Sequence, residues 1–286
     1  EGQVSEASGS NGGLVGYNTG SIDLSSSSAN VFTYSGLSSS LGGLVGYSLS
    51  GQIGGPSGIV SEPGSISRSY ATGNVTNYGS DTIFSAGGLV GTTTARSYTN
   101  YVNAASITDS YSTGNVSSPS GNIGGLAGLI SSKTTISDSY SIGSVTGQGS
   151  GNGTVGASIG LNQSSLLTNV YFDSNRAAVS NTVGSGTSYG ITGLTTLQWA
   201  TEGPSTPNSP YSFSLPSAWT SGTPYPVISA LPYQIVVVSG QSVYGSDPAS
   251  GTWTNTSAGL DSPLVGYQSA ASASSSVGSY VAWGTG

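Results

Sequence analysis

Carboxylates recur at equivalent places in successive copies of a short motif. Asp109 and Asp138 each stand two residues before a tyrosine, and Arg68 and Asn169 hold the same place in neighbouring copies. Paired acids one repeat apart could perform general acid–base cleavage of a polysaccharide. The alternative is an outward column in which Arg68 offsets the charge of Asp109 and the other members are solvated. Because two carboxylates without a basic partner or a metal cage make a poor active site, the sequence predicts no catalytic residues and no enzyme.

Other chemistry is restricted by composition. The chain has no Cys, His or Met, which excludes thiol nucleophiles, imidazole bases and ordinary zinc sites. Asp173, Ser174 and Asn175 could bind Ca²⁺ weakly through oxygen ligands, although an Asx-turn explains the same residues. We therefore expect no cofactor beyond this weak calcium candidate. Sugar attachment is also open, at the five Asn-x-Ser/Thr sites Asn74, Asn115, Asn152, Asn162 and Asn255.

The aromatic residues divide into two predicted sets. The first set stands in the repeated motif and is predicted to stack as a structural ladder: Phe32, Tyr70, Tyr111, Tyr140 and Tyr171. The second set lies in the longer inserts between motifs and comprises Tyr78, Phe84, Tyr98 and Tyr101. Loops on a rigid scaffold commonly carry binding residues. We therefore expect ligand contacts at this second set.

Charge and hydropathy limit the partners. The chain has 4 basic and 11 acidic residues, and charged residues make up only 5% of it. Four scattered cations cannot form a phosphate-binding surface, so nucleic acid is excluded as an expected partner. The longest strongly apolar run, residues 235–238, is far too short to span a bilayer, so membrane insertion is not expected. Abundant Gly and Ser with little charge are typical of an exported surface protein, and any export leader would lie outside these residues.

Two sequence motifs alternate along the first part of the chain. Gly-Gly-Leu-Val-Gly occurs at 12–16, 42–46 and 87–91, with variants at 124–128 and 156–160. Between them lie motifs of the form Ile-x-x-Ser-Tyr-x-x-Gly-x-Val, at 66–75, 107–116 and 136–145. The spacing indicates a basal repeat of about 30 residues with insertions at turns. Such alternation is typical of stacked units that bury their apolar faces against one another.

Within each repeat the residues favour strands. Branched and aromatic side chains alternate with Ser and Thr, and helix formers are scarce. We therefore predict an all-β fold, a parallel β-helix of about five coils, in which tyrosines form one ladder and Leu/Val pairs form another inside. A β-propeller is the rival, but its blades need about 40 or more residues each.

Three regions follow from these patterns. Residues 1–171 form the predicted β-solenoid. Residues 172–232 form a bridge and a Pro-rich capping segment, with one helical turn at 194–200 capped by Thr195 or Thr196. Seven prolines within 203–232 argue against regular strands there and suggest an irregular lid over the last coil. Residues 233–286 alternate again and are predicted to form a small sandwich-like β-domain.

The two repeated motifs, Gly-Gly-Leu-Val-Gly-Tyr and Ser-Tyr-Ser-Thr-Gly-Asn-Val, resemble the GLUG repeats of large bacterial surface proteins, including filamentous-haemagglutinin-type adhesins. Residues 169–226 resemble the segment that closes such arrays. Residues 241–281 are similar to the MBG modules of the same proteins. Those modules usually continue for a further strand or two, so the module here is expected to be incomplete. The resemblance implies export, a β-helical shaft and adhesive or matrix roles, and it supplies no catalytic residues.

Two functions therefore remain open, with an enzyme as an outsider. The first is a secreted or cell-surface structural and adhesive protein, a rigid shaft that mediates attachment or builds matrix. The second is a self-assembling subunit of an extracellular fibre or sheath, joined head-to-tail by strand complementation. The outsider is a polysaccharide-active β-helix enzyme. The expected location is extracellular or on a bacterial cell surface, and the expected partners are further copies of the chain or glycans and proteins of the host or matrix.

Overall fold

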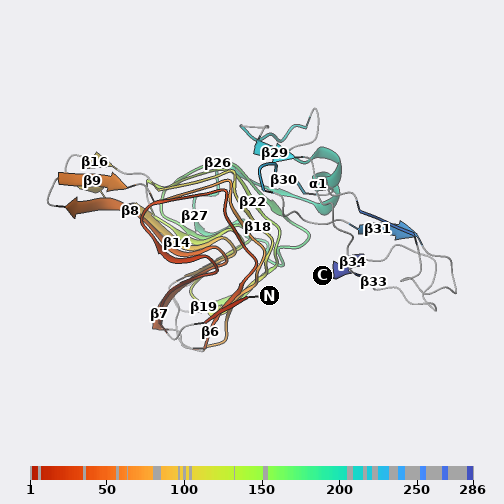
Figure 1. The fold of residues 1–286 in the computed structure, drawn as a ribbon, viewed down its shortest axis with the longest axis horizontal. Helices are drawn as coiled ribbons and strands as arrows, with labels where there is room; N and C mark the ends of the chain where they lie inside the picture. The colour runs from red at the N-terminus through yellow and green to blue at the C-terminus, as the bar shows by residue number, and fades with distance from the viewer. Residues whose placement is uncertain are drawn as a thin grey trace.

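The computed structural model describes most of the repeat region and parts of the remainder. The described residues are 2–5, 8–34, 37–55, 58–62, 64–79, 85–95, 97–98, 101–102, 105–131, 133–150, 154–204, 209–214, 218–220, 225–231, 238–241, 252–255, 266–269 and 282–285. Figure 1 shows the repeats as rungs laid on one another, with further elements on their flanks.

Four parallel sheets, named A to D here, form the walls of the stack. Sheet A contains β1 (Gln3–Ser5), β6 (Asn30–Thr33), β12 (Val75–Asn77), β19 (Val116–Ser120) and β23 (Val145–Ser150). Sheet B contains β2 (Ser8–Gly12), β7 (Leu37–Gly42), β13 (Ser85–Gly87), β20 (Asn122–Gly124) and β24 (Val155–Gly156). Sheet C contains β3 (Val15–Asn18), β8 (Val45–Gly55), β14 (Val90–Ala95), β21 (Ala127–Ile130), β25 (Ile159–Asn162) and β27 (Val183–Gly186).

Sheet D completes the coil and is interrupted by a corner in its early rungs. Its longer row contains β4 (Ser21–Asp23), β10 (Ser65–Ser67), β17 (Ser106–Thr108), β22 (Thr135–Ser141) and β26 (Leu166–Asp173), and the part of β26 beyond the corner pairs with β28 (Ile191–Leu194). Beyond the corner lie β5 (Ser26–Ser27), β11 (Tyr70–Ala71) and β18 (Tyr111–Ser112), which continue into β22. The chain visits D, A, B and C in turn. The predicted all-β parallel β-helix is therefore confirmed, because sheet neighbours come from successive repeats.

Register between rungs places like residues on like. Ile66 pairs with Ile107, and Ile107 pairs with Ile136. Val75 pairs with Val116 in sheet A. Since strand neighbours lie about 4.8 Å apart, each repeated side chain contacts its own counterpart one rung away. The repeats of the sequence are therefore rungs of the structure.

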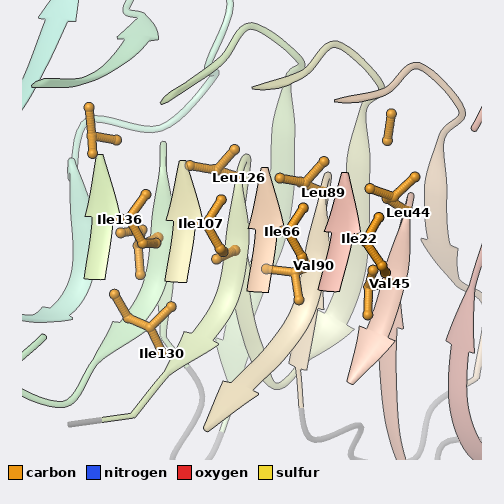
Figure 2. Packing of buried hydrophobic residues seen from close by; sticks show 14 of the residues in the cluster. Ile22, Leu44, Val45, Ile66, Leu89, Val90, Ile107, Leu126, Ile130 and Ile136 are labelled. Carbon is orange, nitrogen blue, oxygen red and sulfur yellow. The ribbon is translucent and has the colours of Figure 1, made fainter. Parts of the chain in front are cut away.

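Two internal apolar clusters fill the coil. The larger lies between sheets C and D and contains Leu44, Leu89, Leu126 and the isoleucine column, all buried (Figure 2). The smaller lies between sheets A and B and contains Val31, Val75, Val116 and Val145 with Leu41 and Ile123. The predicted aliphatic ladder is therefore internal.

The paired glycines allow close approach between rungs. A Cβ on Gly87 would lie 2.0 Å from the carbonyl oxygen of Val90 and 2.6 Å from the backbone nitrogen of Gly128. Either contact is far inside van der Waals distance, so a side chain here would separate the rungs. The paired glycines therefore serve the close packing of the rungs.

Insertions leave the stack at its turns, as predicted. β8 runs on into an antiparallel pairing with β9 (Gly58–Glu62), between sheets C and D. In the next rung, β15 (Ser97–Tyr98) and β16 (Tyr101–Val102) pair antiparallel at the corresponding turn. Figure 1 shows both pairs beyond the edge of the coil. The rungs keep their register because the extra residues lie outside the walls.

The segment after the last rung differs from the predicted lid. Helix α1 (Thr196–Glu202) begins after Thr195, which makes a capping box with Gln198, so the predicted helix and cap are confirmed. Where the sequence argued against regular strands, the described Pro-rich residues contain one antiparallel pair of two-residue strands, β29 (Trp219–Thr220) and β30 (Val227–Ile228). Two-residue strands leave room for prolines beside them. We call the described residues from Thr195 to Leu231 the strap.

The strap lies along the flank of sheet D instead of only over the last coil. Its Trp199, Phe213, Trp219 and Tyr225 form one buried cluster with the repeat tyrosines of several rungs. In Figure 1, α1, β29 and β30 lie beside β22 and β18. Without the strap, the repeats would expose a row of tyrosine rings on this flank. The apolar strap residues cover these rings, which explains where the strap lies.

The last described residues form two short antiparallel pairs. β31 (Val238–Gln241) pairs with β32 (Thr252–Asn255), and β33 (Gly266–Ser269) pairs with β34 (Ala282–Thr285). The sandwich-like module over 233–286 stays a prediction. In the part of the chain that the structure describes, no helix has the length and apolar character needed to cross a membrane.

Candidate functional site

The repeat tyrosines form a stacked file on the outer side of sheet D. Tyr70 and Tyr111 have ring centroids 4.8 Å apart at an interplanar angle of 6°, and Tyr111 and Tyr140 repeat this at 4.8 Å and 3°. Tyr171 is in backbone register with Tyr140. Its ring instead meets Trp199, Tyr211 and Phe213 edge-on.

Phe32 does not belong to this ladder, so that part of the prediction was wrong. Tyr70 is in register with Ser26. Phe32 lies in sheet A, in register with Ser5 and Thr76. The Asn-Val dipeptide that precedes Phe32 recurs at 74–75 and 115–116, and this signal could have placed Phe32 in the correct column.

The strap buries the tyrosine ladder. The Tyr140 hydroxyl donates a hydrogen bond of 2.6 Å to the Pro226 carbonyl, and the Tyr140 ring contacts Trp199, Trp219 and Tyr225. Burial raises the pKa of Tyr140 well above its ordinary value, and it raises the pKa of Tyr171 to about 12. These phenols therefore stay protonated near neutral pH and act as packing groups and hydrogen-bond donors.

The acidic column lies at a backbone corner. Arg68, Asp109, Asp138 and Asn169 have φ of 44°, 46°, 49° and 51°. This left-handed conformation is tolerated best by Asn and Asp among residues with side chains. Asp109, Asp138 and Asn169 therefore have a conformational reason for their residue types that is independent of catalysis.

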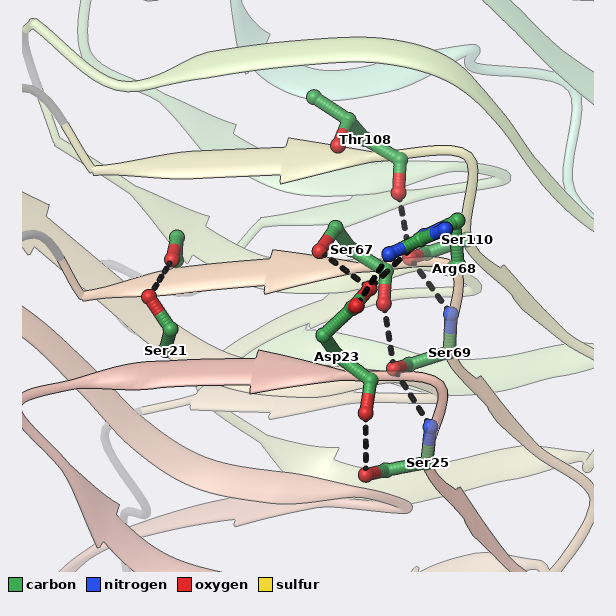
Figure 3. Close-up of polar contacts among 9 residues, drawn as sticks. Ser21, Asp23, Ser25, Ser67, Arg68, Ser69, Thr108 and Ser110 are labelled. Carbon is green, nitrogen blue, oxygen red and sulfur yellow. Dashed lines mark hydrogen bonds and ion pairs between the residues drawn. The ribbon is translucent and has the colours of Figure 1, made fainter. Parts of the chain in front are cut away.

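Serine hydroxyls connect these corners from rung to rung. The backbone N–H of Ser25 donates to Ser69 Oγ at 3.1 Å, and that of Ser69 donates to Ser110 Oγ at 3.2 Å. Each hydroxyl in turn donates to a carbonyl two residues earlier in its own rung, as at Ser69 and Ser67 (2.6 Å). Figure 3 shows this chain of contacts across three rungs. The corner polar groups are thereby satisfied within the stack.

Arg68 forms its ion pair with Asp23, an acid of the preceding rung. Its Nε donates to Asp23 Oδ1 at 2.9 Å, and its Nη2 contacts the other carboxylate oxygen (Figure 3). The hydrogen bond from Arg68 lowers the pKa of Asp23. The charge of Arg68 still acts on Asp109, where it opposes the rise in that carboxyl's pKa, although the ion pair itself forms with the preceding rung.

Asp109 and Asp138 are buried beneath the strap, so the predicted solvation of Asp138 was wrong. Asp109 accepts a hydrogen bond from Trp219 Nε1 at 3.0 Å. Asp138 accepts from the backbone N–H of Ser214 at 2.7 Å and from Asn169 Nδ2 at 2.9 Å. Burial raises the pKa of Asp109, with Asp138 adding to the rise. Both carboxylates therefore serve as acceptors that fix the strap. No local sequence pattern reveals that the strap supplies their donors.

Asp173 holds the strap in the same way. Its Oδ1 accepts from the backbone N–H of Asn175 at 2.8 Å, which is the Asx-turn alternative. Its Oδ2 accepts from Thr196 Oγ1 at 2.8 Å and from the Tyr225 hydroxyl at 2.5 Å. Among the described residues, no three His, Cys, Asp or Glu side chains gather closely enough to hold a metal ion. The weak calcium site stays a prediction, and Ca²⁺ there would have to replace these donors.

One predicted contact residue, Tyr78, belongs to an exposed aromatic cluster. Tyr34 and Tyr78 stack with centroids 5.2 Å apart at 20°, and they are 70% and 62% exposed. Phe32 meets both rings edge-on, at 5.6 and 6.2 Å. Sequence reasoning missed Tyr34 and Phe32 as partners of Tyr78. Strand alternation could have found them, since Val31 and Thr33 point inward and leave Phe32 and Tyr34 outside.

The other predicted contact residues are described less fully. Phe84 lies outside the described residues. Tyr98 and Tyr101 oppose one another in the β15–β16 pair, of which only the backbone is described. This pair follows sheet C, whereas Tyr78 follows sheet A, so the structure assigns these residues to different turns of the coil.

A second exposed pair of tyrosines stands on sheet C. Tyr17 and Tyr47 stack at 5.3 Å and 7°, and Tyr17 is 54% exposed. The Tyr47 hydroxyl is 2.9 Å from Thr94 Oγ1. The next member of this register is Thr92, which is buried. The row of rings therefore ends after two rungs.

Within the described residues, the candidate binding group is thus the exposed cluster of Phe32, Tyr34 and Tyr78, and the Tyr17–Tyr47 pair stands apart from it on sheet C. The covered ladder and its acids hold the strap in place. Comparison of the chain with protein-family models, with curated proteins and with solved structures found no match.

Proposed function

We propose that this chain is a secreted or cell-surface structural and adhesive protein whose stacked coils form a rigid shaft. The observation that carries the proposal is the in-register stack together with the strap, which contacts Tyr111, Tyr140 and Tyr171 on successive rungs. A solenoid is held only by contacts between neighbouring repeats. A strap that crosses three rungs adds contacts that resist their separation, as a load-bearing element requires.

Composition and motif resemblance support the same proposal. Only 5% of the residues are charged and the chain has no oxidisable Cys or Met, which suits a durable exported protein. The GLUG-like repeats are found in surface adhesins, and the exposed aromatic rings offer contact groups on an otherwise polar wall. The partners would be glycans or proteins of a host surface or matrix. A polysaccharide-cleaving role has little support, since the two column acids are engaged by the strap.

Bead adhesion tests the proposal. Beads coated with the full chain are flowed over surfaces bearing matrix proteins or polysaccharides, beside beads coated with heat-denatured chain. Retention of the native-chain beads alone, under increasing shear, is the expected result. Equal retention of both bead types on every surface would refute the adhesive function.

The fibre-subunit alternative is favoured by one specific observation. Leu14 is 48% exposed in the first rung, whereas its counterparts Leu44, Leu89 and Leu126 are fully buried by the rung before them. The first described rung can therefore receive a further rung, either from the same polypeptide or from a second copy. Electron microscopy separates the two functions. Fibres with a regular axial repeat that disappear in Leu14→Asp would establish the subunit function. Monodisperse rods would instead favour the function of a single adhesive shaft.

A further inference from the structure

The outer face of sheet A carries three rows of outward side chains. Along each strand the valines point inward and are fully buried, as Val31, Val75, Val116 and Val145 show. Alternate residues therefore point outward. Successive rungs lie about 4.8 Å apart and alternate residues about 7 Å apart along a strand, so the outward side chains form a regular grid.

The first row presents amide groups. Asn30 Oδ1 accepts from the backbone N–H of Asn74 at 2.8 Å, and Asn74 Oδ1 accepts from that of Asn115 at 2.9 Å. Asn115 Oδ1 accepts from Ser144 in the next rung at 2.9 Å. The oxygen of each amide is thus used within the ladder, which fixes the side chain and leaves its NH₂ group as a donor. The middle row adds the hydroxyls of Thr76, Ser117 and Thr146.

The third row is apolar and begins beside Phe32. Tyr34 and Tyr78 follow Phe32 and Thr76 by two residues, and Pro119 holds the next place and is exposed. Stacking between Tyr34 and Tyr78 occupies one face of each ring. The exposed remainder of each ring, its hydroxyl and the edge-on Phe32 ring lie on the outside of the sheet.

Among its described residues the grid carries no charge. Its described outward residues are Gln3, Ser5, Asn30, Phe32, Tyr34, Asn74, Thr76, Tyr78, Asn115, Ser117, Pro119, Ser144 and Thr146. An uncharged surface gives no attraction to phosphates, sulfates or carboxylates. A sugar ring, in contrast, has C–H faces that pack on aromatic rings and hydroxyls that pair with amides and hydroxyls. Tyrosine serves such contacts well, because its body is apolar and its tip is polar.

We propose that the outer face of sheet A binds an extended, neutral polysaccharide. The sugar rings lie against Phe32, Tyr34 and Tyr78, and their hydroxyls hydrogen-bond to the amides and hydroxyls of the adjoining rows. Pre-ordered side chains on a rigid wall lower the entropic cost of holding a long polymer. This inference rests on the proposed adhesive function and names its ligand class and surface.

The test measures binding of the full chain to insoluble neutral polysaccharides. Cellulose, chitin and an insoluble β-1,3-glucan are incubated with the chain, and the free and bound fractions are measured, with the acidic polysaccharide alginate as a counter-ligand in affinity gels. Binding to at least one neutral polymer and none to alginate is expected. The double variant Tyr34→Ala/Tyr78→Ala should lower the affinity by about tenfold or more, which corresponds to about 1.4 kcal/mol.

Tyr17→Ala is the matched control, because Tyr17 is also an exposed tyrosine stacked on another. It should bind as the unchanged chain does. All variants remove exposed rings, and circular dichroism and urea midpoints confirm that each one folds. Unchanged binding in the double variant, or an equal loss in Tyr17→Ala, overturns the assignment to sheet A.

Two further results would also overturn the inference. The first is no binding to any neutral polymer, and bead adhesion to protein-coated surfaces would then show whether the adhesive function survives without it. The second is a change of oligomeric state in the double variant during analytical ultracentrifugation, which would identify the face as a contact between copies of the chain.

Discussion

Tyr140 is the position where the stack and the strap depend most on one side chain. Tyr140 is fully buried, its ring stacks on Tyr111, and its hydroxyl donates to the Pro226 carbonyl. Tyr140→Phe keeps the ring and removes this one hydrogen bond, leaving a buried carbonyl without its donor. We expect a loss of about 1–2 kcal/mol in the free energy of unfolding.

Tyr140→Ala removes the ring as well. The cavity would be lined by Trp199, Trp219 and Tyr225, which contact the ring from the strap side. Truncation of a buried aromatic residue costs about 3–5 kcal/mol, a large part of the roughly 5–15 kcal/mol by which proteins are stable. The Ala variant should therefore lose the strap under conditions in which the Phe variant keeps it.

Equilibrium urea unfolding measures both effects, with tryptophan fluorescence reporting on the strap through Trp199 and Trp219. Circular dichroism follows the strands in parallel, because repeat arrays do not always unfold in one step. Tyr17→Ala is the control, since an exposed ring should change stability by less than about 0.5 kcal/mol. Equal shifts in Tyr140→Ala and Tyr17→Ala would refute the burial of the ladder beneath the strap.

Three further predictions concern the glycines and the charged corner. Gly87→Ala should strongly destabilise the chain, because its Cβ would lie 2.0 Å from a backbone oxygen. Gly20→Ala is the control, since a Cβ there meets nothing within 4 Å and should leave stability unchanged. Similar melting temperatures of the two variants would contradict close packing of the rungs. Burial raises the pKa of Asp109, so this group makes the native state less stable as pH rises above its ordinary value of 3.8. Asp109→Asn keeps an acceptor oxygen and should remove this part of the pH dependence, and a profile of unfolding free energy parallel to that of the unchanged chain would count against it. Arg68 lowers the pKa of Asp23, so the stabilising effect of the Asp23 carboxylate is present above pH 3.8 and is lost as pH falls through the lowered pKa. Arg68→Asn should return the pKa of Asp23 towards its ordinary value in an NMR titration. An Asp23 pKa that does not move would argue against the ion pair.

The rungs could be predicted because their signals are local and repeated. Each copy of the tyrosine motif contains its own strand pattern, and stacking follows once several copies occur in order. Phe32 was misplaced because one aromatic residue was aligned with another by type. The Asn-Val dipeptide before it identifies its true column, which also reveals the exposed Tyr34–Tyr78 pair.

The strap could not be placed from the sequence. Its contacts join residues far apart in the chain, such as Trp219 with Asp109 and Ser214 with Asp138. No periodic signal connects a Pro-rich segment to one flank of a solenoid. The burial of Asp109 and Asp138 follows from those contacts, so the solvation of Asp138 was mispredicted for the same reason. The helix cap at Thr195, in contrast, depends only on Gln198 three residues later and was visible in the sequence.

Cross-linking tests the stacking of like residues most directly, since the chain contains no cysteine of its own. Thr108 and Ser137 are register partners on adjacent rungs, and Ser67 holds the same column one rung before Thr108. Adjacent partners lie about 4.8 Å apart and second neighbours about twice as far, whereas a disulfide needs Cα atoms within about 7 Å. Thr108→Cys/Ser137→Cys should therefore oxidise to an internal disulfide, and Ser67→Cys/Ser137→Cys should stay reduced. Failure of the first pair to close, or equal closure of both, would contradict the stack.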